Sequence, residues 1–236
     1  MRFRPRHRRM LLPALALLAA LLAGCGSSSS SSGNGVASKA PSEIVAAAKA
    51  AAAGAATAHV AGSIVNEGKP ISLDMELVSG EGGKGRLTLE GLTINLIQVN
   101  GAVYILGSKA FYTHVAGAAA AQLLQGKWLK APASGGNFSS LASLTELDKL
   151  VNSTLAAHGK LVSAGTSTVN GQPAVGVTDA TKGGTLYVAT TGTAYPIAIV
   201  KAGTNGGRIT FDRWNQPVTL SAPANAVNIN QLQSGH

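Results

Sequence analysis

The spacing of apolar residues changes along the chain, and a two-residue period dominates two long stretches. Between Ile71 and Leu77, apolar residues alternate with polar ones such as Asp74 and Glu76. This pattern predicts a β-strand with one face in solvent. The same alternation is found at 87–90 and 92–96, and the run Val103-Tyr104-Ile105-Leu106 is expected to be the returning strand. Asn100-Gly101 has the composition of a tight hairpin turn, and the short turns leave no room for crossovers, so we expect an antiparallel meander.

A second series of alternating segments runs from residue 160 to residue 221, with turns such as Asn170-Gly171 between them. The two series together predict about ten strands. In the first series the alternation slips by one position between Leu96 and Ile97, which predicts a β-bulge or a strand corner.

Three segments have helical spacing and lie before and between the two series. The first begins near Pro41, where Ser42 is expected to cap it and Gly54 to end it. The second spans 109–125, and the third is expected to open with the capping box at 143–146 and to continue through Leu155. Strand series with separate helices are typical of the α+β class.

The N-terminus has the features of an export signal. Five arginines precede an apolar run from Met10 to Ala23, which is shorter than the roughly 20 residues that span a bilayer. The run ends in Leu22-Ala23-Gly24-Cys25, which resembles the lipobox of bacterial lipoproteins. The resemblance implies cleavage before Cys25 and attachment of fatty acyl chains, palmitate among them, to that residue. An ordinary signal peptide with a chance cysteine is the alternative.

The chain therefore divides into three expected parts: a signal peptide at 1–24, a lipidated Cys25 with a Ser/Gly tether at 25–40, and a folded domain at 41–236. The tether is rich in Ser, Gly and Asn, so we expect it to be flexible. Removing residues 1–24 removes five of the 19 Lys and Arg, and 14 basic against 10 acidic residues remain, a net charge of +4. No Lys/Arg cluster supports a nucleic-acid partner.

Catalytic patterns are missing from the sequence. The histidines after the signal, at positions 59, 114, 158 and 236, are scattered, and no serine-hydrolase or P-loop pattern is present. Asp74 and Glu76 could form an acid/base pair or a calcium site, but a solvated strand face is the simpler interpretation. Trp128 and Trp214 could stack on sugar rings, or could lie at a core edge or a membrane-facing rim. We therefore expect no enzyme activity, no cofactor and no metal.

The order of these parts resembles the LolA/LppX-LprG-type lipoproteins of actinobacteria, over most of 41–222. The stretches that carry the resemblance are Val99–Tyr104, Gly126–Lys130, Val169–Val175, Leu186–Val188 with Tyr195-Pro196, and Arg208–Phe211. The resemblance implies an open, incomplete antiparallel β-barrel with helices packed on its concave side and an apolar cavity between them. Members of the family carry lipoproteins, acylated lipids or glycolipids across the cell envelope.

Inward-facing positions of the predicted strands are the candidate lining of such a cavity. They are Ile71, Leu73, Met75, Leu87, Leu89, Ile94, Leu186, Val188, Ile209 and Phe211. Small side chains could leave space for acyl chains, or the Ala-rich helices could approach and fill it. The first case predicts an exported lipoprotein, anchored to the outer face of the cytoplasmic membrane, that binds or carries a lipid. The second predicts a structural lipoprotein with a filled core that docks on another envelope protein.

Overall fold

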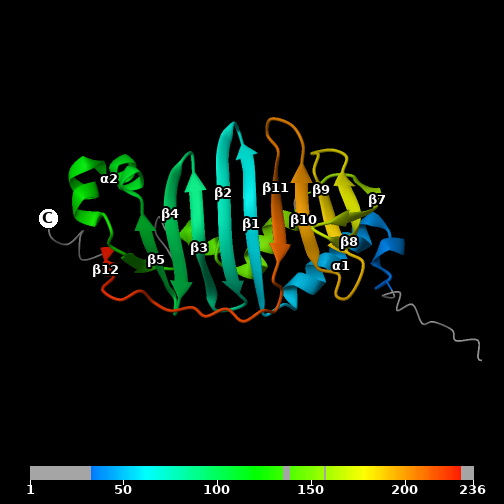
Figure 1. Ribbon diagram of the computed structural model, residues 1–236, viewed down its shortest axis with the longest axis horizontal. Coiled ribbons are helices and arrows are strands. Elements are labelled where there is room, and N and C mark those ends of the chain that lie inside the picture. The colour runs from blue at the N-terminus through cyan, green and yellow to red at the C-terminus, as the bar shows by residue number, and fades with distance from the viewer. Residues whose placement is uncertain (1–32, 135–138, 157, 230–236) are drawn as a thin grey trace, which may run out of the picture. The chain divides into compact units, whose positions relative to one another are not determined.

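The computed structural model describes residues 33–134, 139–156 and 158–229, so the predicted signal peptide and Cys25 lie outside the described residues (Figure 1). All described strands belong to one sheet of twelve strands. The strands are β1 (Thr57–Asn66), β2 (Lys69–Val78), β3 (Gly82–Leu89), β4 (Leu92–Val99), β5 (Ala102–Gly107), β6 (Leu129–Pro132), β7 (Leu161–Val169), β8 (Gln172–Asp179), β9 (Thr185–Ala189), β10 (Pro196–Lys201), β11 (Gly207–Asp212) and β12 (Val227–Asn228). The helices are the short 3-10 helix η1 (Val36–Ser38), then α1 (Pro41–Ala53), α2 (Lys109–Leu124), α3 (Ser139–Ser143) and α4 (Leu147–Ala156).

Two antiparallel meanders are joined through β1, which pairs with β2 on one side and with β11 on the other. The strand order is β12-β6-β5-β4-β3-β2-β1-β11-β10-β9-β8-β7, and β12 and β7 stand at opposite ends of this order. The sheet is therefore not closed, as expected for an incomplete barrel. The two-residue pairing of β12 with β6 is parallel, while the other pairs are antiparallel.

Helices α1 and α4 pack against each other and against one face of the sheet, which we call the inner face. From α1, the buried residues include Ile44, Val45 and Ala48, and from α4 they include Val151 and Leu155. These side chains belong to one apolar core with residues of the strands. The opposite face, which we call the outer face, is turned toward the viewer in Figure 1, with α3 and α4 behind the sheet. The expected open barrel with packed helices is confirmed.

Two helix starts differ from the sequence-based predictions. The residue that precedes the first turn of α1 is Ala40, whose backbone N–H donates to Glu43 Oε2 over 2.9 Å, so Ser42 is not the cap. The predicted capping box at 143–146 does not open a helix, because α4 begins only at Leu147. The hydroxyl of Thr145 instead lies 2.6 Å from the side chain of Gln98 on β4.

No bulge interrupts β4, so that prediction is wrong. Leu96 pairs with Gly85 and Ile97 pairs with Lys84 in continuous register. The apolar Ile97 instead lies in a small outer-face cluster with Trp128 and Leu220. The segment after β11, which contains Leu220, crosses the ends of the strands at the bottom of Figure 1 and leads to β12. The series of alternating segments was predicted to extend to residue 221, but residues 218–221 form no strand, and the chain pairs again only at β12.

The folded part also begins before Pro41. Val36 is 2% exposed and belongs to the main core. The backbone N–H of Asn34 donates to Thr190 O over 2.8 Å, and its side-chain amide donates to Ala189 O over 2.9 Å. Residues 34–39, which were expected to belong to the flexible tether, are thus fixed beside the end of β9, because one buried valine and one asparagine anchor them.

Candidate functional site

An apolar cavity of about 830 Å³ lies on the inner face, between the sheet and the segment that contains α3 and α4. Its wall on the sheet side comes from β1, β2, β3, β10 and β11. Leu141, Leu144 and Leu150 line it from the helical side. Since neighbouring strands present every second residue to the same face, the aliphatic positions of five strands converge on this space.

The candidate lining residues separate into two groups. Those that line the cavity are Ile71, Leu73, Leu87, Leu89, Ile209 and Phe211. Four others do not line it: Met75, Ile94 and Val188 are buried in the packed core, and Leu186 borders a separate pocket of about 110 Å³. The reason is that the helices cover the inner face unevenly. They pack over the parts of the sheet that hold Met75, Ile94 and Val188, and they leave space above parts of β1, β2, β3, β10 and β11.

Sequence reasoning missed other lining residues. Val60, Ile64 and Ile199 lie on predicted strands, but each has at least one apolar neighbour in the sequence, so the polar/apolar alternation that marked the other lining residues is weak there. The helical leucines carried no such signal. Nothing in the local sequence indicates which part of the sheet a short helix will cover.

The mouth of the cavity lies at the end of the sheet where the β1–β2 and β10–β11 turns meet. Val65 N–H donates to Gly206 O over 2.8 Å, which joins the ends of β1 and β11. Ile64 and Leu89 line the cavity and are each 37% exposed, so the rim is partly apolar. The polar rim residues are Glu67, Lys201 and Asn205.

The opposite end of the cavity is closed by packing. Met75 and Leu96 meet Leu144 and Leu150 there around a residual void of only about 10 Å³. The cavity is thus open at the strand ends and closed toward the core. The filled interior that one sequence-based interpretation required is not observed.

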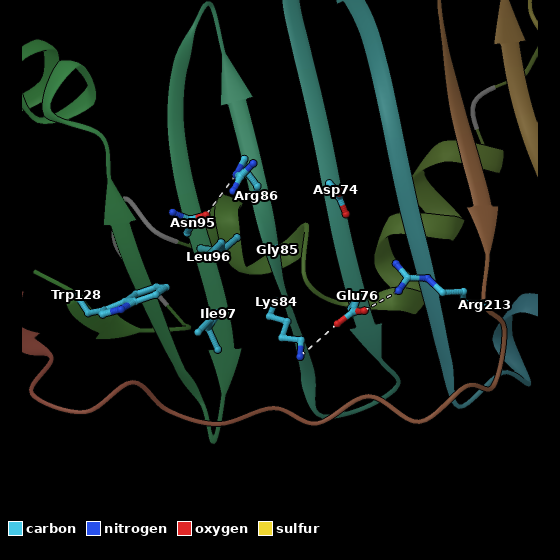
Figure 2. Close-up of a pocket in the computed structure, with 10 residues that line it drawn as sticks. All are labelled: Asp74, Glu76, Lys84, Gly85, Arg86, Asn95, Leu96, Ile97, Trp128 and Arg213. Atoms are coloured by element: carbon cyan, nitrogen blue, oxygen red, sulfur yellow. Dashed lines mark hydrogen bonds and ion pairs between the residues drawn. The ribbon is translucent and has the colours of Figure 1, made fainter. Parts of the chain in front are cut away.

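A second hollow, a groove of about 420 Å³, crosses the outer face (Figure 2). Six of its ten lining residues are charged or polar, and Leu96, Ile97 and Trp128 add apolar surface, with Trp128 at one side. Glu76 accepts a hydrogen bond from Arg213 Nη1 at 2.9 Å and pairs with Lys84 Nζ at 3.3 Å. Arg86 Nε lies 3.5 Å from Asn95 Oδ1. The charged groups of the groove are therefore largely engaged with one another.

Asp74, which also lines the groove, contacts a histidine side chain. His59 Nε2 lies 2.9 Å from Asp74 Oδ1, and His59 Nδ1 lies 2.6 Å from Asp212 Oδ1, so one imidazole bridges two strands. Among the described residues, no three His, Cys, Asp or Glu side chains are arranged to hold a metal ion. The arrangement supports the interpretation of Asp74 and Glu76 as members of a solvated, ion-paired strand face.

The two tryptophans have different surroundings. Trp214 stacks on Tyr195, with ring centroids 4.5 Å apart and an interplanar angle of 5°. Its indole Nε1 is buried and has no hydrogen-bond partner in the described part of the chain. Trp128 packs beside Tyr104 and Leu220 on the outer face. Trp214 therefore belongs to a core edge, and Trp128 forms one wall of the groove.

Within the described residues, none of the helices combines the length and the apolar character that crossing a membrane requires.

An open antiparallel half-barrel with helices on one face and an apolar cavity beneath them is the fold expected from the LolA/LppX resemblance. Two solved structures share it. The crystal structure of LprF from Mycobacterium bovis superposes with a TM-score of 0.55 at 16% identity, over 78% of this chain and 97% of LprF. The lipoprotein LppX from Mycobacterium tuberculosis gives 0.50 at 17% identity, over 77% of this chain and all of LppX. At these identities the likeness concerns the fold, and at that level the resemblance is confirmed. The chain matches no known family profile and no curated protein by sequence.

Proposed function

We propose that this protein is an exported, membrane-anchored lipoprotein that binds or carries a lipid or another hydrophobic ligand in the cell envelope. The observation that carries the proposal is the apolar cavity of about 830 Å³ with its partly exposed mouth. This volume lies within the roughly 300–1,000 Å³ of pockets that bury most of a ligand.

Burial of acyl chains would supply the affinity. Each methylene group moved from water into an apolar cavity contributes about 0.8 kcal/mol. The polar side chains of the lining are Glu67, Thr154, Lys201 and Asn205, and Thr154 Oγ1 already donates to the carbonyl of Leu150 over 2.6 Å. The other three lie at the mouth. A ligand with an apolar tail and a polar head would therefore enter tail first, with its head beside the rim.

The role is proposed as non-catalytic. A hydrolase would need a nucleophile and an acid/base group placed together in the cavity. The wall is apolar apart from Thr154, which is hydrogen-bonded to the carbonyl of Leu150, and Glu67 and Lys201 lie at the mouth. Binding and release require only that a tail pass the mouth, where Ile64 and Leu89 already expose apolar surface.

Anchorage through a lipidated Cys25 is the second part of the proposal. The lipobox-like sequence before Cys25 supports it, and so does the shared fold with LppX, a protein described as a lipoprotein. Gly33 is eight residue-to-residue steps after Cys25, which limits the distance between them to about 29 Å. An anchor of this length on the outer face of the cytoplasmic membrane would hold the cavity close to its source of ligand.

Native mass spectrometry of the protein purified from membranes tests the cavity. We expect a mass excess that disappears on organic extraction and a lipid in the extract. A bare polypeptide mass, together with no uptake of a fluorescent fatty acid by the extracted protein, would contradict the proposal.

The anchor is tested separately with Cys25→Ala. The N-terminal peptide of this variant should lack the mass of the acyl chains. The signal peptide should no longer be cleaved before position 25. If the variant is still cleaved before position 25 and is as hard to extract from membranes as the parent protein, the proposed anchor is wrong. The proposal of a lipid-binding cavity would not be affected.

A further inference from the structure

Helix α2 stands at one end of the sheet, beside β4 and β5, and covers little of it (Figure 1). Its buried residues are Tyr112 and Ala121, which pack with Leu129 of β6. Val115 is 57% exposed and Leu123 is 68% exposed, the highest values among the large apolar side chains that the structure describes. Two strongly exposed apolar side chains on one helix make that helix a candidate for contact with an apolar phase.

The helix is broken at Gly117, which has φ 84° and ψ 168°. A residue with a Cβ would be strained in this conformation, so glycine at this position permits the break. One exposed apolar side chain lies on each half of the helix, and the residues around the break are mostly alanines. Small side chains therefore separate the two exposed apolar residues.

The same end of the molecule carries no acidic residue. No Asp or Glu occurs between Glu90 and Glu146, nor anywhere after Asp212. These two segments supply β4, β5, α2, β6, α3 and β12, which include the strands at that end of the sheet order. The lysines of this end, Lys109, Lys127 and Lys130, are all exposed. A net charge of only +4 after residue 24 is therefore distributed unevenly, with one end purely cationic.

We propose that α2, together with Lys109, Lys127 and Lys130, docks onto an anionic phospholipid surface independently of Cys25. Val115 and Leu123 enter the boundary between headgroups and acyl chains, as apolar residues of interfacial helices do. The lysines attract the anionic headgroups, at about 1 kcal/mol each. A lipid surface fits better than a protein because it adapts to two half-helices and requires no matching pocket.

Docking through α2 would fix the orientation of the domain on the membrane. The residues next to the tether, Asn34 and Val36, are fixed beside the end of β9. Eight strand-to-strand steps separate β9 from β6 in the sheet order, which corresponds to a path of roughly 40 Å along the curved sheet. An anchor at one end and a docking helix near the other would hold the row of strands along the membrane, whereas the anchor alone would let the domain rotate.

Vesicle binding tests the proposal with the chain from Ser32 onward. This part forms one compact unit that contains every described helix and strand and the described core, so we expect it to fold without the preceding residues. We expect it to bind phosphatidylglycerol vesicles, to bind phosphatidylcholine vesicles weakly, and to lose binding as salt is raised. The double variant Lys109→Glu/Lys127→Glu should reduce partitioning by at least about 25-fold, at fivefold for each lysine. Leu123→Ser should reduce it by about tenfold.

Matched controls lie away from this end. Val162, 36% exposed on β7, is replaced by Ser, and the exposed Lys39 and Lys160 are replaced together by Glu. These variants should bind anionic vesicles like the parent chain, apart from a uniform effect of net charge that is smaller than that of Lys109→Glu/Lys127→Glu. Circular dichroism checks that every variant is folded.

A spectroscopic measurement locates the contact. The chain from Ser32 has no cysteine, so Leu123→Cys and Val162→Cys each give a single site for an environment-sensitive fluorophore. The label at 123 should shift to the blue with anionic vesicles, and the label at 162 should not. Equal binding to both vesicle types, or equal losses in the controls, would overturn the proposal. Binding to polyglutamate without binding to vesicles would also overturn it and would assign the surface to an acidic protein.

Discussion

The hydroxyl of Thr145 lies 2.6 Å from Oε1 of Gln98, and both residues are buried. The same hydroxyl lies 2.7 Å from the carbonyl oxygen of Ala142, so its single proton is shared between two acceptors. This contact joins the connection between α3 and α4 to the inner face of β4. Gly83 makes room for it, because a Cβ there would lie 3.1 Å from Thr145 O and 2.7 Å from a methyl group of Leu77.

Thr145→Val should destabilise the fold by about 1–3 kcal/mol, because the buried carbonyl of Gln98 loses its donor. Adding Gln98→Leu should recover most of this loss, since an apolar pair leaves no polar group unsatisfied. Chemical unfolding of the two single variants and the double variant measures the coupling. Additive losses would show that the contact contributes little.

The same contact illustrates what the sequence could not predict. Ser143 to Glu146 has the composition of a capping box, but Thr145 engages a residue 47 positions away on another element. A local pattern cannot compete with a partner that only the tertiary fold supplies. The alternating strands and their turns were predictable because their signals are local. Asn100 and Asn170 have φ values of 53° and 51°, as an Asn-Gly hairpin turn requires.

The cavity was predictable only in part, for the same reason. Alternation placed Leu73, Leu87 and Phe211 on the inner face, and they do line the cavity on that face. Alternation depends only on the strand itself and can therefore be read from the local sequence. Whether an inner-face residue borders open space or packed core depends on where the helices lie. Met75 lies on the same strand as Leu73 and yet is core, because the helical segment reaches the sheet at that level.

Val36→Ala should detach the segment before α1. Val36 is the buried residue of η1, and truncating it should cost about 1–3 kcal/mol through lost burial and the cavity left behind. The hydrogen bonds of Asn34 should break with it, which would make residues 33–40 accessible to proteases. Limited proteolysis followed by mass spectrometry measures the cleavage. Ala37→Gly, at an exposed neighbouring position, should leave the protease resistance unchanged; equal cleavage of both variants would contradict the buried anchor.

Asp179 should make the stability depend on acid pH. Its carboxylate accepts the backbone N–H groups of Lys182, Gly159 and Thr181, and these hydrogen bonds, that of Lys182 first, lower the pKa of Asp179. A lowered pKa in the folded state means that the stabilisation is complete above the pKa of the unfolded chain, near 3.9, and is lost as the pH falls through the folded value.

Asp179→Asn should therefore lower the thermal midpoint at pH 7, because an amide NH₂ cannot accept these N–H groups at both positions. The difference from the parent chain should shrink below about pH 4, where the parent loses its own advantage. Thermal unfolding at pH 7 and pH 3 measures both effects. Glu81→Gln, in the exposed turn between β2 and β3, serves as the control and should give no such pH-dependent difference.

Leu73→Trp should block the cavity and weaken ligand binding. Leu73 is half-buried, lines the cavity, and lies directly opposite Leu87 on β3. An indole at this position would fill space that acyl chains would otherwise occupy. Excluding even two methylene groups, at about 0.8 kcal/mol each, corresponds to about 15-fold weaker binding.

The control is Ser72→Trp on the same strand. Adjacent residues of a strand point to opposite faces, so this indole would lie on the outer face and leave the cavity open. Titration with a fluorescent fatty acid, and the mass excess of each protein after purification from membranes, should separate the two variants. If both tryptophans reduced binding equally, or neither did while both proteins were folded, the ligand would have to bind elsewhere, and the outer-face groove beside Trp128 would be the next site to examine.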